Sequence, residues 1–263
     1  RQTFLLRNGR GVTLTEPGLV LLEHGRGILH QVALAREELE STRGALGGHV
    51  SIGLPPSLSK LITVPLTLEF RKRLPNAHLT LTEGFSVAMN EGLRSGRLDM
   101  ALLYNPTHSP DIETQILHRE TLVLIASKAC VQRLKGPALK ARMPLPILAE
   151  LPLILPSRPN AFRILIETEL AGMALKPKIE LEVDGLNAIL ELVGEGLGFA
   201  VLPPYTLSNF QKPHSFTTHR LYNPQLVCEL MLVTSARRPS TETHKGVQAL
   251  VADVVKQAMQ DYR

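Results

Sequence analysis

The residues best suited to bind a ligand follow a short apolar segment in the first third of the chain. Val50-Ser51-Ile52-Gly53-Leu54 predicts a strand, and Pro55-Pro56-Ser57-Leu58-Ser59 follows it at the start of a helix expected over 57–74. Two hydroxyls and the free backbone N–H groups of a helix N-terminus meet there, a combination that suits a carboxylate or another small anion. The alternative is that Ser57 merely caps its helix, and both roles can coexist.

Residue patterns typical of catalysis do not occur in the sequence. The nine histidines show no HxxxH or HxH spacing and no neighbouring carboxylate cluster suited to a metal, so we expect them to be scattered surface or hydrogen-bonded side chains. Gly194-Glu195-Gly196-Leu197-Gly198 resembles a phosphate-binding loop, but it follows a predicted helix and precedes a predicted strand, the reverse of the dinucleotide fingerprint. No GxSxG nucleophile elbow is present. We therefore expect no enzymatic activity, no metal and no cofactor.

Strands and helices alternate in the pattern of the chain from His49 onward. Further strands are predicted at 78–83, 98–104, 121–126, 153–155, 178–183, 198–202 and 226–234, and helices at 57–74, 86–94, 160–170, 186–193 and 241–259, with Pro65 kinking or restarting the first helix. This alternation predicts an α/β fold with mostly parallel sheets covered by helices, in two units. In such sheets ligands bind beyond the carboxyl ends of the strands.

A basic turn precedes this α/β region. Arg7-Asn8-Gly9-Arg10-Gly11 lies between two short apolar runs, and Asn-Gly is the dipeptide that best suits a tight hairpin turn. The flanking Arg7 and Arg10 would reach the phosphates of DNA, whereas the plainer interpretation is a solvated surface turn.

A long amphipathic helix is expected after the hairpin, with Thr15 as its cap. Apolar or small residues recur at alternating spacings of four and three, namely Leu21, Gly25, Ile28, Val32, Ala35 and Leu39. This heptad seam predicts dimerisation through Leu21, Ile28, Val32 and Leu39, and the alternative is an ordinary core-facing helix. Gly44-Ala45-Leu46-Gly47-Gly48 then predicts a flexible break before a separate domain.

Composition narrows the class of protein further. The chain has 263 residues, 44% of them hydrophobic, and no apolar stretch long enough to span a membrane, so we expect a soluble globular protein. A formal net charge of +5 and a pI near 9.4 favour anionic partners without identifying one. Cys130 and Cys228 could pair, but they fit buried small side chains in a reducing cytoplasm better. No signal-peptide pattern follows Arg1, although a processed mature chain would look similar.

Four segments in this order and spacing resemble the LysR-type transcriptional regulators: Arg7–Thr15, Gly48–Gly53, Leu93–Leu102 and Gly194–Pro203. The resemblance covers essentially the whole chain, and residues 50–56 and 98–104 look closest to the branch that contains the nitrogen assimilation control protein. It implies the remnant of a winged helix-turn-helix at 1–15, a linker helix that pairs in an antiparallel dimer at 16–46, and an effector-binding domain like the periplasmic binding proteins at 49–263. Within that domain it implies subdomain I at about 49–119 and 226–263 and subdomain II at about 120–225. The implied partners are promoter DNA, a small-molecule effector and further copies of the chain, as a dimer or tetramer.

The sequence departs from the family pattern at its start. Family members carry upstream residues with the helix-turn-helix, whose second helix enters the major groove, whereas this sequence opens just before the wing. We therefore expect a DNA-binding regulator of which this chain alone shows no sequence-specific binding.

The resemblance also implies which residues line the effector cleft. Ser57, between Pro56 and Leu58, falls where the family's effector-contacting serine or threonine lies, and Ser86 matches a second polar position. Tyr104 stands where some relatives that sense aromatic acids place an arginine, which argues against a simple benzoate-like effector.

Subdomain II is expected to contribute the rest of the cleft. The loop that faces the cleft in the family is Pro156-Ser157-Arg158-Pro159 with Asn160, and Arg158 is the only obvious cation near the site. Asp184 and Asn187 border the cleft at the next strand-to-helix turn. Helix caps and a solvated loop arginine are the plainer interpretations of these residues.

Two other functions compete with a regulator. A solute-binding receptor would use the same two-lobed fold to trap a small anion, but the hairpin and the heptad helix favour the regulator. A shortened chain that inhibits full-length partners by pairing with them is the third possibility, and nothing in the sequence supports it over simple truncation.

Overall fold

The computed structural model describes residues 2–9, 11–41, 47–133, 139–208, 210, 216–236 and 240–260. The N-terminal part is a hairpin and a long helix. β1 (Leu5–Asn8) pairs antiparallel with β2 (Gly11–Leu14), which confirms the predicted hairpin, and α1 (Glu16–Ser41) follows. The Thr15 hydroxyl accepts a hydrogen bond from Gly18 N at 3.1 Å and so caps α1. Arg7 is exposed, and Arg10 lies outside the described residues.

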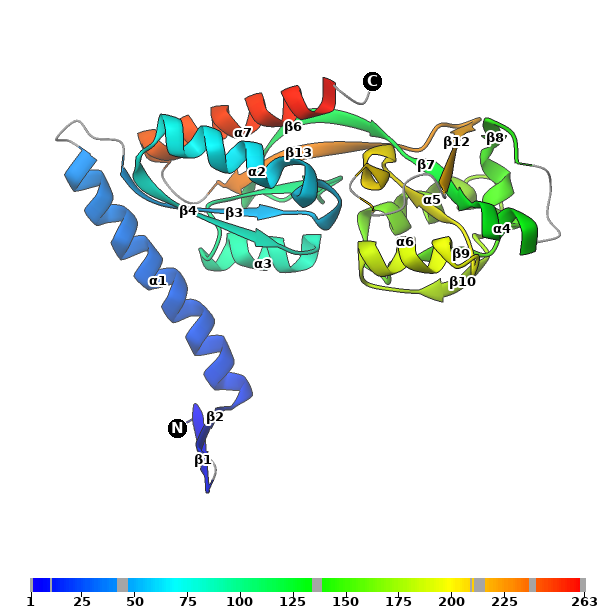
Figure 1. Ribbon diagram of the computed structural model, residues 1–263. Coiled ribbons are helices and arrows are strands. Elements are labelled where there is room, and N and C mark those ends of the chain that lie inside the picture. The colour runs from blue at the N-terminus through cyan, green and yellow to red at the C-terminus, as the bar shows by residue number, and fades with distance from the viewer. Residues whose placement is uncertain are drawn as a thin grey trace.

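The helix α1 leads away from the rest of the molecule and carries the hairpin at its far end (Figure 1). The four seam residues Leu21, Ile28, Val32 and Leu39 are between 46% and 73% exposed. This apolar face is therefore uncovered in the single chain.

Lobe I is built on a five-stranded sheet in the order β4-β3-β5-β13-β6. Its strands are β3 (Gly47–Leu54), β4 (Asn76–Glu83), β5 (Met100–Tyr104), β6 (Ile112–Thr121) and β13 (Val227–Ser235). The first three pair parallel, as predicted, whereas β13 runs antiparallel to both β5 and β6. The long strand β6 was not predicted.

Helices cover both faces of this sheet (Figure 1). α2 (Pro56–Arg73) and α7 (Glu242–Gln260) lie on one face, and α3 (Ser86–Ser95) lies on the other. α2 continues through Pro65, so of the two predicted alternatives, a kink or a restart of this helix, the restart is wrong. Gly96 ends α3 in the left-handed conformation (φ 79°), as expected for a glycine after a helix.

Lobe II contains a four-stranded sheet in the order β11-β7-β12-β8 and a parallel pair, β9 and β10. The strands are β7 (Val123–Ser127), β8 (Arg142–Pro144), β9 (Leu153–Leu155), β10 (Ile179–Glu182), β11 (Ala200–Leu202) and β12 (Phe216–Tyr222). The helices are α4 (Lys128–Arg133), α5 (Ala161–Ala171), α6 (Leu186–Gly194) and the short 3-10 helices η1 (Leu145–Ala149) and η2 (Pro204–Leu207).

The central strands β5 and β7 are buried along their whole length because other elements cover both of their faces. The glycine-rich segment after α6 forms a turn, with Gly196 in the left-handed region (φ 78°). Cys130 and Cys228 are buried free thiols, as expected. Among the described residues, no helix has the length and apolar character needed to cross a membrane.

Candidate effector site

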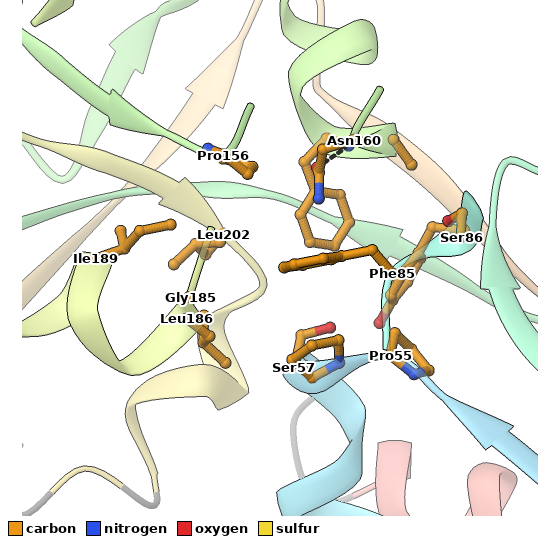
Figure 2. Close-up of a pocket in the computed structure, with 14 residues that line it drawn as sticks. Pro55, Ser57, Phe85, Ser86, Pro156, Asn160, Gly185, Leu186, Ile189 and Leu202 are labelled. Carbon is orange, nitrogen blue, oxygen red and sulfur yellow. Dashed lines mark hydrogen bonds between the residues drawn. The ribbon is translucent and has the colours of Figure 1, made fainter. Parts of the chain in front are cut away.

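A cavity lies between the two lobes (Figure 2). Both lobes contribute to its wall. Lobe I supplies Pro55, Pro56, Ser57, Phe85, Ser86 and Tyr104, and lobe II supplies Pro156, Asn160, Ala161, Phe162, Gly185, Leu186, Ile189 and Leu202. None of these described lining residues carries a charge, so the wall is apolar with a few hydroxyl and amide groups.

Three helices begin at this cavity without a side-chain cap. The N-cap residues of α2, α3 and α6 are Pro55, Phe85 and Gly185, and for none of the three does a described side chain accept the first N–H groups. By contrast, the Asn160 side chain caps α5, because its Oδ1 accepts hydrogen bonds from Phe162 N at 3.0 Å and Arg163 N at 3.4 Å. Free N–H groups and the positive ends of three helix dipoles therefore meet at one uncharged cavity.

Ser57 and Tyr104 line the cavity from lobe I, and Tyr104 contacts Tyr205 of η2 in lobe II. Ser57 is buried and belongs to the first turn of α2. The hydroxyl of Tyr104 is hydrogen-bonded to that of Tyr205, and the Tyr104 ring lies 4.8 Å from the ring of Phe162. Burial, and next the nearby Glu120 carboxyl, raise the pKa of Tyr104, while hydrogen bonds with Tyr205 and Ser57 oppose the rise. Both tyrosine hydroxyls are therefore protonated and available only as neutral hydrogen-bonding groups.

A second, more polar hollow adjoins the cavity and shares Pro56, Phe85, Gly185 and Leu186 with it. Lys60 on α2 lines this outer hollow and donates a hydrogen bond of 2.6 Å from Nζ to Oδ1 of Asn187 on α6. This bond joins the two lobes. On the same side, Asp184 accepts a hydrogen bond from the backbone N–H of Ser157 at 2.9 Å.

A buried carboxyl lies close to the two tyrosines. Glu120, near the end of β6, is paired in register with Cys228 on β13, and its Oε2 atom is buried with no hydrogen-bond partner among the described residues. Burial raises the pKa of Glu120 from 4.5 to about 7. This carboxyl is near half-protonation at neutral pH.

The structure brings most of the predicted site residues to the cavity but not all of them. Pro56, Ser57, Ser86 and Tyr104 line the inner cavity, and Asp184 lines the outer hollow. The side chain of Leu58 is fully buried in the hydrophobic core and lines neither hollow. Leu58 is therefore not a lining residue.

Of the predicted loop of lobe II, Pro156 and Asn160 line the cavity, whereas Ser157 and Arg158 do not. The Arg158 side chain is 69% exposed, pairs with Glu167 at 2.6 Å and lines neither hollow. Ser157 does not line either hollow and contributes only its backbone N–H to Asp184. Among the described residues that line the two hollows, the cation is Lys60. It lies four residues after Pro56, and this spacing places both on one side of a helix.

Sequence reasoning also missed the aromatic and aliphatic wall, most of all Phe85, which lines both hollows. Among the described residues, no group of three or more histidine, cysteine or acidic side chains is placed to hold a metal ion.

Comparison with known proteins agrees with this fold. The family model described as the LysR substrate binding domain matches residues 43–256. The nitrogen assimilation regulatory protein Nac of Klebsiella aerogenes is 30% identical over 255 residues, which are 97% of this chain and 81% of that protein. Nac of Escherichia coli (strain K12) is 28% identical over 263 residues, 100% of this chain and 84% of that protein.

Solved structures of similar fold include the effector binding domain of QuiR in complex with shikimate. It has a TM-score of 0.68 and 18% identity, and the match covers 80% of this chain and 98% of that one. CbnR, a LysR family transcriptional regulator, has a TM-score of 0.66 and 19% identity, with 93% of this chain and 81% of that one covered. The two-lobed α/β fold and the resemblance inferred from the motifs are confirmed. These relatives are regulators and not enzymes, and the chain belongs to the LysR family of transcriptional regulators.

Proposed function

We propose that the cavity between the lobes binds a small organic anion with an apolar body, and that this effector controls a DNA-binding regulator. The observation that carries the proposal is the meeting of three uncapped helix N-termini, those of α2, α3 and α6, at a cavity lined by no charged residue. Helix N-termini stabilise an anion without a cationic side chain. The apolar wall accounts for the rest of the ligand, because pockets of this kind bury mostly apolar surface around a few placed polar groups.

Ser57 and Ser86 are the proposed hydroxyl contacts of the effector. They belong to the first turns of α2 and α3 and line the same cavity from lobe I. The QuiR domain, which shares this fold, is described in complex with shikimate, a precedent for a small ligand in such a domain.

Two contacts between the lobes favour a mechanism in which effector binding changes the relative orientation of the lobes. Tyr104 meets Tyr205 beside the cavity, and Lys60 meets Asn187 at its outer side. A ligand that binds the closed arrangement better than an open one shifts the population toward closure. Closure would change the angles between protomers and the spacing of their DNA-binding heads, so effector and DNA affinities are reciprocally linked.

The proposed assembly is a homodimer or tetramer that forms through α1 and acts on promoter DNA in the cytoplasm. The exposed seam of Leu21, Ile28, Val32 and Leu39 supports this, because a soluble helix with such an apolar face gains stability from a partner. Arg7 on the exposed hairpin is the proposed contact to the DNA backbone, in a protein that carries the upstream helix-turn-helix.

A thermal-shift screen with small alicyclic and aromatic carboxylates tests the effector site. We expect at least one compound to raise the melting temperature of the chain, and Ser57→Ala to weaken its binding by about 10- to 100-fold, as for the loss of a hydrogen bond to a charged group. The matched control is Ser59→Ala, because Ser59 lies two residues further along α2, bonds to Thr63 at 3.4 Å and does not line the cavity. Equal weakening by both variants, or no effect of Ser57→Ala, would contradict the proposed contact.

Native mass spectrometry of the purified chain tests the assembly and any ligand carried from the host. A dimer or tetramer supports pairing through α1. A ligand-bearing monomer would contradict it and favour the solute-receptor interpretation of the fold.

A further inference from the structure

The long helix α1 packs closely against lobe I at one glycine. Gly27 is buried, and a Cβ at this position would overlap the backbone carbonyl oxygen of Ser95, the last residue of α3. Only glycine lets a helix backbone approach a neighbouring carbonyl so closely. Gly25, on the same helix, has no atom within 4 Å of the corresponding Cβ position. Gly18, nearer the start of α1, approaches the carbonyl of Phe4 in the N-terminal part, so of these three glycines Gly27 is the one that meets lobe I.

A second residue shows that this face of α1 is covered beyond one point. Gln31 follows Gly27 by one helical turn, and its Nε2 atom is buried with no hydrogen-bond partner among the described residues. A buried amide without a partner costs free energy. The contact between α1 and lobe I must outweigh that cost. An apolar residue in place of Gln31 would remove the cost and make the contact more stable.

The other end of α3 lies at the proposed effector site. Phe85, its N-cap, and Ser86, its first residue, both line the cavity. The ten residues of α3 span about 15 Å at the usual rise per residue. Met89 and Leu93 are buried between these ends, so the helix is fixed to the sheet along its length. One short, well-packed helix thus touches the cavity with its first turn and α1 with its last carbonyl.

We propose that α3 couples the occupancy of the cavity to the packing of α1 against lobe I at Gly27. A ligand that moves the first turn of α3 displaces the Ser95 carbonyl and with it the contact to Gly27. The helix α1 carries the hairpin at its far end, so a small change at this contact becomes a larger displacement there. This inference rests on the proposed effector site, and it assigns α3 and Gly27 as the route from that site to the N-terminal part of the chain.

Because coupling between two sites is reciprocal, it can be measured from the α1 side without any ligand. Hydrogen–deuterium exchange is compared for the wild-type chain, Gly27→Ala and the matched control Gly25→Ala, which adds the same methyl group to the same helix where space is open. We expect Gly27→Ala to accelerate amide exchange about tenfold through α3, including Met89 near its cavity end, whose N–H donates to the carbonyl of Phe85, because overpacking weakens the contact between α1 and lobe I. Gly25→Ala should leave exchange in α3 unchanged.

A second variant should strengthen the contact between α1 and lobe I instead of weakening it. Gln31→Leu removes the unpartnered amide, and we expect it to slow exchange in α3 relative to the wild type. An effect of Gly27→Ala confined to α1 and residues 93–97, or equal effects of the two alanine variants, would overturn the coupling. Failure of the carboxylate screen with intact coupling would instead count against the effector site alone, and binding without coupling would count against α3 alone.

Discussion

Replacement of Glu120 by glutamine should abolish a pH dependence of stability that the wild-type protein shows near neutral pH. Glu120 is buried, its Oε2 atom has no hydrogen-bond partner among the described residues, and burial raises its pKa from 4.5 to about 7. The folded state therefore holds this proton more tightly than the unfolded chain does. The contribution to stability is fully present below pH 4.5 and is lost as the pH rises through 7.

The size of the effect follows from the difference between the two pKa values. Each pKa unit corresponds to 1.36 kcal/mol, so a rise from 4.5 to about 7 removes about 3 kcal/mol of unfolding free energy between acidic and mildly alkaline pH. Glu120→Gln keeps the shape of the side chain and stays neutral. At pH 8 the variant should be more stable than the wild type by up to about 3 kcal/mol, or about 6 to 12 °C in melting temperature for a domain of this size.

Thermal unfolding between pH 5.5 and 8.5 measures this difference. The matched control is Glu113→Gln, because Glu113 lies on the same strand β6 but is exposed. We expect the control to keep the wild-type pH profile and Glu120→Gln to flatten it. If Glu120→Gln retained the wild-type profile, or were less stable than the wild type at pH 8, then burial would not be raising the pKa of this carboxyl.

Two further variants test the packing that holds lobe II. Arg163 is 7% exposed and pairs with Glu167 at 2.5 Å, so Arg163→Met should lower the free energy of unfolding by about 2 kcal/mol. The control is Arg119→Met, at an ion pair in which the arginine is 72% exposed, and it should change the free energy of unfolding by less than about 0.5 kcal/mol. Urea titration measures both values, and equal losses would refute the argument from burial. Gly198→Ala should lower the free energy of unfolding by about 1–3 kcal/mol, because the new Cβ would lie 2.8 Å from the carbonyl oxygen of Pro152. Gly246→Ala, at an open position of α7, should raise the free energy of unfolding by up to about 1 kcal/mol. Melting temperatures of the two variants that shift in the same direction would contradict this.

Several site residues could be predicted because their positions depend on local rules. A serine directly after a strand and at the start of a helix, as with Ser57, must lie at the carboxyl end of that strand wherever the strand sits in its sheet. Ser86 follows the same rule. Tyr104 ends a strand that its apolar run identifies as buried.

Other site residues could not be placed in this way. Lys60 reaches Asn187 only because the two lobes face each other, and 127 positions separate the two residues in the chain. Arg158 turns to Glu167, nine residues further along the chain, and not to the cavity. The choice between those two cations depends on which carboxylate or amide the fold brings within reach.

The strand β6 shows the same limit at the level of the fold. Its sequence, Ile112-Glu113-Thr114-Gln115-Ile116-Leu117-His118-Arg119-Glu120-Thr121, has no clear apolar alternation, and the strand forms because it pairs with β13 more than a hundred residues later. The burial of Glu120, and with it the raised pKa, exists only in that pairing.

The sequence by itself determined the family, the alternation of strands and helices, the hairpin and its following helix, and the serines at the strand ends. Periodicity, turn residues and caps act over a few neighbouring residues and can be read in order. The tertiary structure decided the uncharged wall of the cavity, the Tyr104–Tyr205 and Lys60–Asn187 contacts, and the close approach of Gly27 to Ser95. Those features depend on distances between residues far apart in the chain, which only the packing of lobes and helices fixes.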